Sequence, residues 1–181
     1  MIPIIILLGA PGTGKSTYGQ HVACKLGVPW ISSGLLLREA AARDERIARI
    51  MESGRLVPDE DVERALFDRL AEAKSGFVLD GYPRTVSQAR NLLRFLRERS
   101  LKITCVYHLR APDDVLLQRL LARGREDDRP DVIRERLRVY QVETEAVIQV
   151  FEDAGTEIVD IDNSPPIEEV KRLLDATLID V

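Results

Sequence analysis

The sequence is poor in cysteine, histidine and aromatic residues. Its 181 residues include two cysteines, two histidines and only 5% aromatic residues. Cys24 and Cys105 are far apart and lack C-x-x-C spacing, which argues against a disulfide framework and a zinc site and favours the reducing cytoplasm. The scarcity of aromatic side chains argues against the stacking surfaces on which single-stranded nucleic acids bind.

Positive charge is not in excess either. The 26 basic residues are outnumbered by 30 acidic ones, the net charge is −4, and only five of the basic residues are lysines. This balance disfavours a nucleic-acid binder held by bulk positive charge. Basic residues therefore have to be considered one by one, according to their place in a motif.

Long apolar runs are also missing. No stretch reaches the length of about 18 apolar residues that indicates a membrane helix, so we expect no membrane span. The N-terminal segment MIPIIILLGA is apolar, but it lacks a basic start and leads directly into a glycine-rich turn. It is therefore typical of a buried strand and not of a targeting segment.

Apolar runs alternate along the chain with segments of helical periodicity. We predict strands at 2–8, 28–31, 76–80, 103–109 and 157–161, and helices at 14–26, 35–52 (one or two), 59–74, 87–99, 112–123, 131–153 and 165–178. The length and this alternation indicate a single α/β domain over 1–181, with five parallel strands and helices on both faces of the sheet.

Two stretches interrupt the alternation. Residues 32–61 have helical patterns and no strand, and residues 123–131, RGREDDRPD, are almost wholly polar. We interpret both as excursions from the core and not as linkers between domains. Both are candidates for flaps that close over a ligand and exclude water.

The segment GAPGTGKST, residues 9–17, follows the first predicted strand and precedes the first helix. It fits the pattern G-x-x-x-x-G-K-[ST], in which backbone N–H groups of a glycine-rich loop bind phosphates at a helix N-terminus. The lysine of such a loop reaches the β- and γ-phosphates, and the following hydroxyl suits Mg²⁺. We expect a nucleoside triphosphate to contact Gly12, Thr13, Gly14, Lys15, Ser16 and Thr17.

The segment GFVLDGYPRT, residues 76–85, places charged side chains where another buried strand ends. Asp80 ends the strand, and a carboxylate there is suited to hold Mg²⁺ through a water molecule. Arg84 follows just beyond the carboxyl end of the strand, at the edge of a parallel sheet where ligands bind. Its guanidinium group could fork onto a phosphate.

Five segments together resemble a known family. GAPGTGKST, ISSGLLLRE, SGRLVPDE, GFVLDGYPRTVSQA and RGREDD…RERLRVYQVET occur in the order, and nearly the spacing, of the nucleoside monophosphate kinases, and the whole chain is similar to adenylate kinases with a short lid. The resemblance implies a P-loop NTPase fold with strand order 2-3-1-4-5, an NMP-binding insert at 32–61 and a short lid at 123–131. It also implies a monomer that transfers the γ-phosphoryl group of Mg·ATP to AMP, giving two ADP. The lid contains no cysteine, so structural zinc is not expected.

The resemblance assigns roles to residues that match the family's motifs. Arg119 and Arg123 match arginines that hold ATP, and Asp127 and Asp128 are implied to hold the lid arginines when the lid closes. The catalytic residues that it implies are Lys15, Arg84, Arg123, Arg125 and Arg136, with Ser16 and Asp80 at the metal.

On the acceptor side, Arg84 is implied to meet the α-phosphate of AMP and Gln88 to pair with the edge of adenine. The acceptor contacts that the resemblance implies are Ser33, Arg38, Arg55, Leu56, Val57, Gly81, Tyr82, Pro83, Arg84, Gln88, Arg125 and Arg136. The segment PRTVSQA resembles the adenylate branch of the family and therefore favours AMP, with a UMP/CMP kinase as the alternative.

The sequence departs from the family's usual pattern at several positions. Ser16 stands where glycine is usual, Leu35 where aspartate is usual, and Ser33 where threonine is usual. The segment DIDNSPP lacks a glycine that often lies near the base of ATP, so no residue there is assigned. Leu35 and the short acceptor insert keep open a second alternative, an adenylate-binding module with little turnover.

Overall fold

The computed structural model describes residues 2–178, and its centre is a five-stranded sheet. The strands are β1 (Ile4–Gly9), β2 (Trp30–Ser32), β3 (Phe77–Asp80), β4 (Cys105–Arg110) and β5 (Ile158–Asp162). Their order in the sheet is β2-β3-β1-β4-β5, and each neighbouring pair is parallel. The predicted fold class and strand order are therefore confirmed.

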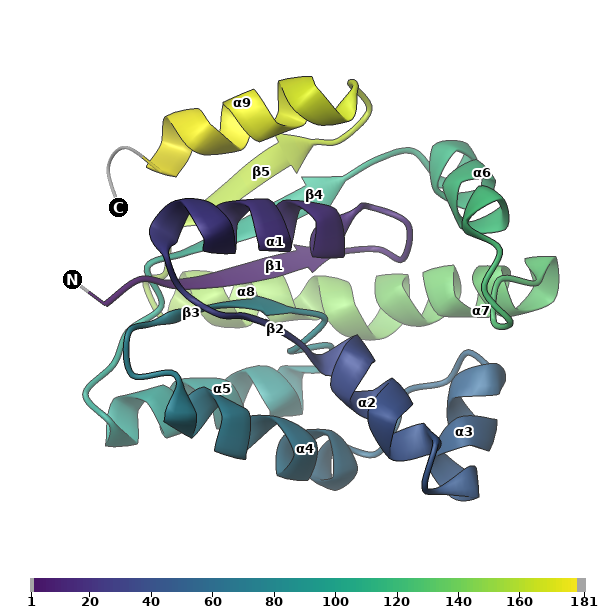
Figure 1. Ribbon diagram of the computed structural model, residues 1–181, viewed down its shortest axis with the longest axis horizontal. Helices are drawn as coiled ribbons and strands as arrows, with labels where there is room; N and C mark the ends of the chain where they lie inside the picture. The colour runs from purple at the N-terminus through teal and green to yellow at the C-terminus, as the bar shows by residue number, and fades with distance from the viewer. Residues whose placement is uncertain (1, 179–181) are drawn as a thin grey trace.

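Helices connect the strands and flank the sheet (Figure 1). They are α1 (Lys15–Leu26), α2 (Ser33–Ala41), α3 (Glu45–Glu52), α4 (Asp59–Glu72), α5 (Val86–Glu98), α6 (Asp113–Arg123), α7 (Pro130–Val139), α8 (Glu145–Asp153) and α9 (Ile167–Thr177). The predicted helical stretch 35–52 is two helices, because Asp44 caps α3 by accepting from the N–H groups of Arg46 and Ile47. Among the helices between Lys15 and Thr177, none is long and apolar enough to cross a membrane.

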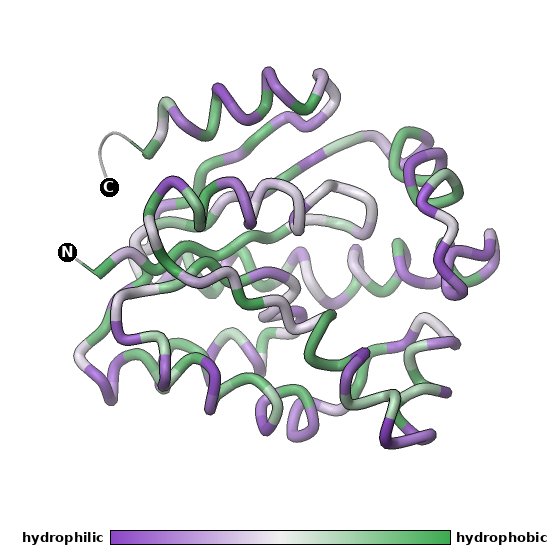
Figure 2. The backbone as a smooth tube through the Cα atoms, viewed as in Figure 1, coloured by the Kyte–Doolittle hydropathy of each residue, from purple (hydrophilic) through white to green (hydrophobic). Residues whose placement is uncertain are grey.

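The apolar run of β1 faces helices on both sides of the sheet. Ile4, Ile6 and Leu8 belong to a core cluster with residues of α2, α3, α4, α5 and α8. Ile5 and Leu7 belong to a second cluster with residues of α1 and α9. Because both faces are covered, successive residues of the strand are apolar without alternation. Figure 2 shows this hydrophobic centre, with hydrophilic residues along the outer helices.

The carboxyl ends of the strands lie at one edge of the sheet, because all the strands are parallel. In Figure 1 this edge is on the right, on the same side as α2, α3, α6 and α7. The loop between β1 and α1 begins at this edge. Open parallel sheets bind their ligands at such an edge.

The helix predicted over 131–153 is present, but it is not α-helical throughout. A π-helical turn, Tyr140–Thr144, separates α7 from α8. In this turn the buried hydroxyl of Thr144 donates to the backbone carbonyl oxygen of Arg84 at 2.9 Å, and the hydroxyl of Tyr140 lies 3.0 Å from Nε2 of His108. The wider turn therefore fixes the helix to the loop after β3 and to β4. Turns of this kind are frequent at functional sites.

Asn163 joins the end of β5 to the loop between β1 and α1. Its side chain is buried, with Nδ2 donating to the carbonyl oxygen of Thr13 at 2.5 Å and Oδ1 accepting from the hydroxyl of Tyr18 at 2.6 Å. Its backbone N–H donates to the carbonyl oxygen of Arg110, and its carbonyl oxygen accepts from the guanidinium group of Arg119, both at 2.8 Å. One residue therefore fixes the loop, α1 and α6 relative to the sheet.

Replacing Asn163 with alanine should destabilise the fold, because the carbonyl group of Thr13 and the hydroxyl of Tyr18 would remain buried without a partner. We expect the free energy of unfolding to fall by about 2–4 kcal/mol, measured by urea denaturation. Tyr18→Phe removes only one of the two bonds and should cost about 1 kcal/mol. If Asn163→Ala is as stable as the wild type, neither bond contributes to stability.

Candidate active site

A cavity of about 270 Å³ lies beside the loop between β1 and α1. Its lining is strongly basic, although the chain as a whole is acidic. The charged residues of the lining are Lys15, Arg38, Asp80, Arg84, Arg119, Arg123, Arg125 and Arg136. Within residues 2–178, Asp80 is the only acidic residue in this lining. A concave surface with this charge attracts polyanions.

The loop at the start of α1 has the shape of a phosphate-binding loop. Gly12 and Gly14 have φ angles of 91° and 73°, in the left-handed region that favours glycine. A Cβ atom on Gly12 would lie 3.0 Å from the carbonyl oxygen of Leu116, so glycine allows α6 to pack closely against the loop. No side chain within residues 2–178 caps the N-terminus of α1. Its N–H groups and helix dipole can therefore receive an anion.

The side chain of Lys15 folds back over this loop. Its ammonium group donates to the carbonyl oxygens of Gly9 at 2.7 Å and Ala10 at 2.9 Å. Burial lowers the pKa of Lys15 from 10.5 to about 8, a shift that the charge of Asp80 opposes and that of Arg84 increases. Lys15 is therefore a charged donor at neutral pH, placed where it can exchange carbonyl oxygens for phosphate oxygens.

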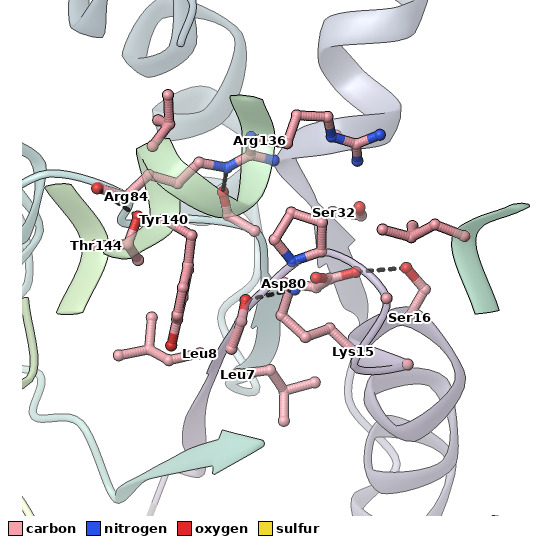
Figure 3. A pocket seen from close by; sticks show the side chains of 18 of the residues that line it. Leu7, Leu8, Lys15, Ser16, Ser32, Asp80, Arg84, Arg136, Tyr140 and Thr144 are labelled. Carbon is pink, nitrogen blue, oxygen red and sulfur yellow. Dashed lines mark hydrogen bonds between the residues drawn. The ribbon is translucent and has the colours of Figure 1, made fainter. Parts of the chain in front are cut away.

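Asp80 and Ser16 form the part of the cavity that could hold a cation. Asp80 is 4% exposed, and its carboxylate accepts from the hydroxyl of Ser16 at 2.8 Å (Figure 3). These are hard oxygen ligands of the kind that Mg²⁺ binds, together with water and phosphate oxygens. Throughout the described part of the chain, no group of three or more His, Cys, Asp or Glu side chains is placed to hold a metal ion. The donor set therefore suits a cation that also takes oxygens from its ligand.

Arg84 and Arg136 lie near Tyr140 and Thr144 in the same cavity (Figure 3). Nε of Arg84 donates to the carbonyl oxygen of Gly81 at 2.8 Å. Burial lowers the pKa of Arg84 and of Arg136, and the charge of Arg136 lowers that of Arg84 further, although both groups stay charged. This crowding of cations is unfavourable in itself and would be relieved by an anion.

Ion pairs hold the arginines of the segment after α6. Asp128 is 7% exposed and accepts from the guanidinium group of Arg123 at 2.6 and 2.8 Å, and from the backbone N–H of Arg125 at 3.0 Å. Burial tends to raise the pKa of Asp128, but these bonds outweigh it and the pKa is lowered. Arg136 donates to Asp127 at 2.9 Å. The two aspartates thus pair with Arg123 and Arg136 in this structure.

A smaller cavity of about 70 Å³ lies next to the first, and Arg38, Arg84 and Arg136 line both. Leu37, Met51 and Val62 give the smaller cavity an apolar surface, which the sequence did not assign to the site. Among the residues predicted at the acceptor, those that line it are Ser33, Arg38, Arg55, Leu56, Val57, Gly81, Arg84, Gln88 and Arg136. Apolar walls with a few polar groups are typical of a site for a planar base.

Two predicted site residues have side chains outside both cavities. Tyr82 is fully buried, its ring packs edge-on against Phe67 and its hydroxyl donates to Glu63, so its side chain lies outside both cavities and its contact with an acceptor stays a prediction. Thr13 is also fully buried: its hydroxyl donates to the carbonyl oxygen of Ala10 at 2.8 Å, its N–H donates to the same oxygen at 3.3 Å, and its carbonyl oxygen accepts from Asn163. All the other predicted site residues, including Thr17, Pro83 and Arg119, line one of the cavities.

Three polar residues that shape the site were not predicted from the sequence. Tyr140 and Thr144 line the larger cavity from the π-helical turn, and Asn163 fixes the phosphate-binding loop from β5. Thr144 could have been noticed in the sequence, because it is a polar residue on the same face of the predicted helix as Tyr140 and Val147. No pattern in the sequence points to Asn163, because its partners Thr13 and Tyr18 are almost the whole chain away.

Comparison with known proteins gives the family. A family model described as adenylate kinase matches residues 7–156. The chain is 41% identical to the adenylate kinase of Nocardia farcinica over 93% of this chain and 94% of the relative. The identity is 40% with the adenylate kinase of Mycobacterium ulcerans (92% and 93% covered) and 41% with adenylate kinase 1 of Nostoc sp. (96% and 97% covered). These relatives do not favour a UMP/CMP kinase. The chain belongs to the adenylate kinase family and is a nucleoside monophosphate kinase.

Proposed function

We propose that the chain transfers the γ-phosphoryl group of Mg·ATP reversibly to AMP, giving two ADP, with ATP in the larger cavity and AMP in the smaller one. The observation that carries this assignment is the junction of the two cavities, which Arg38, Arg84 and Arg136 line from both sides. A group that passes between two nucleotides needs cations at such a junction.

On the donor side, the phosphate-binding loop would hold the β- and γ-phosphates of ATP. The groups available are the backbone N–H groups of Gly12, Gly14, Ser16 and Thr17, the hydroxyls of Ser16 and Thr17, and the ammonium group of Lys15. Thr13 would contact ATP through its N–H, which in the free protein donates to the carbonyl oxygen of Ala10 at 3.3 Å. Arg119 and Arg123 line the same cavity and would hold the rest of ATP. The carbonyl of Asn163 supports this role for Arg119, because it fixes the guanidinium group at 2.8 Å.

Magnesium is the cofactor that fits this site. Ser16 would coordinate Mg²⁺ through its hydroxyl, and Asp80 would hold it through a water molecule, since their oxygens lie 2.8 Å apart at the end of β3. When bound with ATP, Mg²⁺ neutralises charge on the phosphates. Asp80 is the acidic residue of the lining within residues 2–178, so its carboxylate is the group there that attracts a cation.

On the acceptor side, Arg38 and Arg84 would bind the phosphate of AMP. Both line the two cavities, and burial lowers the pKa of Arg38 as it does that of Arg84. The base would lie against the apolar surface of the smaller cavity, with the amide of Gln88 at its edge. The other acceptor contacts that we propose are Ser33, Arg55, Leu56, Val57, Gly81, Pro83, Arg125 and Arg136.

Transfer itself requires positioned charge and no covalent intermediate on the protein. An oxygen of the AMP phosphate attacks the γ-phosphorus as the bond to the β-phosphate oxygen of ATP breaks, and the released ADP takes the negative charge. Lys15, Arg84, Arg123, Arg125 and Arg136 would stabilise the charge on the transferring group. Asp127 and Asp128 support this role, because they orient two of these arginines.

Two segments would close over the nucleotides and exclude water, the acceptor insert at 32–61 and the lid at 123–131. Exclusion of water matters because an open site would lose the phosphoryl group to hydrolysis. Gly124 supports a hinge at the start of the lid: its φ is 65°, and a Cβ atom there would meet nothing within 4 Å. Neighbouring side chains therefore do not confine the backbone at Gly124.

The setting that we propose is the cytoplasm, with the protein as a monomer whose partners are ATP, AMP and ADP. The free thiols of Cys24 and Cys105 are compatible with a reducing compartment. The acidic net charge disfavours nucleic acids and anionic membranes as partners.

Lys15→Met should lower kcat by about a thousandfold, because the transferring phosphates lose a half-buried positive donor. Formation of ADP from ATP and AMP, measured in a coupled assay, checks this. Lys25→Met is the matched control, because Lys25 lies on the same helix but is exposed. Lys15→Met with wild-type turnover and an intact circular dichroism spectrum would exclude the loop from catalysis.

The pKa of Lys15 predicts a pH dependence of ATP binding. A phosphate favours protonated Lys15, and the pKa of about 8 in the free protein means that this proton is partly missing at pH 8. Binding of Mg·ATP should therefore take up about half a proton at pH 8, little at pH 7, and weaken as the pH rises further. Calorimetric titrations in buffers of different ionisation enthalpy measure the uptake, and Lys15→Met should abolish it. Equal uptake in that variant would assign the proton to another group.

Arg84→Ala should raise the KM for AMP and lower kcat, together by about a hundredfold in kcat/KM, because a buried charged fork to phosphate is lost. The Kd for ATP should change much less. Arg90→Ala, on the exposed face of α5, is the control. An Arg84 variant that loses ATP and AMP binding equally would place Arg84 on the donor and not on the acceptor.

A further inference from the structure

The amide of Gln88 is held by two hydrogen bonds within the protein. Gln88 is 2% exposed and lies in the first turn of α5, where its N–H donates to the hydroxyl of the capping residue Thr85 at 3.1 Å. Its Oε1 accepts from the backbone N–H of Arg84 at 2.7 Å, and its Nε2 donates to a carboxylate oxygen of Asp59 at 2.7 Å. The side chain is thus fixed at both ends of the amide.

These partners allow one orientation of the amide. The N–H of Arg84 can only donate, and an ionised Asp59 can only accept. If the amide of Gln88 turned by 180°, its NH₂ group would face another donor and its oxygen would face a carboxylate, so both bonds would become repulsive contacts. Asp59 is itself held in place, since its second carboxylate oxygen accepts from the hydroxyl of Thr85 at 3.4 Å.

Gln88 lines the smaller cavity, whereas Asp59 stands behind it and is not part of the lining. Among the contacts within residues 2–178, the two bonds use one N–H and one lone pair of the amide. A second N–H on Nε2 and a second lone pair on Oε1 are left for a ligand. The bonds to Arg84 and Asp59, and not the ligand, therefore decide which end of the amide presents the acceptor and which presents the donor.

We propose that Asp59 is a positioning residue that makes the site select acceptors with an amino group beside an unprotonated ring nitrogen and reject acceptors with a carbonyl beside a protonated one. This inference rests on the proposed role of Gln88 at the base of AMP. Adenine donates from its 6-amino group and accepts at N1, so it matches Oε1 and Nε2 in this order. Hypoxanthine and guanine present the reverse order, an oxygen at position 6 and N1–H.

A free glutamine amide could serve either class of base by turning over. The carboxylate of Asp59 and the backbone N–H of Arg84 together remove this freedom, so a 6-oxopurine would leave a donor facing a donor and an acceptor facing an acceptor. Sites built on such paired groups reject the wrong ligand strongly, because the buried groups remain without partners. Asp59 is thus the side chain that enforces the discrimination, together with the N–H of Arg84, although Asp59 touches no nucleotide.

The test compares AMP with IMP, two acceptors that differ only at the edge that Gln88 would read. Asp59→Asn is nearly isosteric, and its amide can face either orientation of Gln88 because it both donates and accepts. We expect the ratio of kcat/KM for AMP to that for IMP to fall about tenfold or more, with the KM for ATP unchanged. Glu63→Gln is the matched control: Glu63 lies one turn later on α4 and bonds the side chains of Tyr82 and Asn91, not the amide of Gln88.

The outcomes separate this inference from the function on which it rests. A lower ratio in Asp59→Asn and Gln88→Ala, with the Glu63→Gln ratio unchanged, supports the inference. If Gln88→Ala lowers the ratio but Asp59→Asn only lowers the melting temperature, Asp59 is structural and the inference is overturned while the role of Gln88 stands. If Gln88→Ala also leaves the ratio unchanged, Gln88 does not read the base and both ideas fail.

Discussion

Repulsion among the cations of the larger cavity is the constraint on which the rest of the site depends. Lys15 and six arginines line a space of about 270 Å³, with Asp80 as the acidic residue of that lining within residues 2–178. Two like charges 4 Å apart repel by about 4 kcal/mol near a protein surface, so such a group disperses unless it is held. The lowered pKa values of Lys15, Arg84 and Arg136 express this cost together with that of burial. Phosphate groups would relieve it, because they would place negative charge next to several of these cations at once.

The structure holds the cations with backbone carbonyl groups. Lys15 donates to two carbonyls of its own loop, Arg84 donates to that of Gly81, and Arg119 donates to that of Asn163. Carbonyl dipoles attract a cation without neutralising it, so these side chains keep their charge for a ligand. Arg123 and Arg136 are held differently, by full ion pairs with Asp128 and Asp127. Arg123 is the first residue of the proposed lid and Arg136 follows it, so the carboxylates of the lid can keep both arginines in place before the nucleotides arrive.

The fold and much of the site could be predicted because the sequence patterns that indicate them lie within short segments of the chain. The apolar run at Ile4–Leu8 identifies a strand covered on both faces, and the glycines before Lys15 identify the loop that follows it. Features that depend on distant partners could not be predicted. The π-helical turn follows from contacts of Thr144 and Tyr140 with other elements, and the part played by Asn163 follows from Thr13 and Tyr18. The family resemblance of the segment GYPR assigns Tyr82 to the acceptor, but its ring packs in the core beside Phe67 of α4, a partner that this segment does not reveal.

The prevalence of arginine over lysine in the larger cavity also fits the repulsion among its cations. The chain has 21 arginines and five lysines, and the cavity has six arginines and one lysine. A buried lysine loses its proton readily, as the pKa of about 8 for Lys15 illustrates, whereas a guanidinium group keeps its charge. A cluster of buried lysines would therefore shed protons and lose its attraction for phosphate near neutral pH. Arginines avoid this loss, and their planar forks also fix the directions of the bonds that they donate. Within residues 2–178 the lysine of this lining is Lys15 in the loop, where its ammonium group offers a compact point charge on a flexible stem.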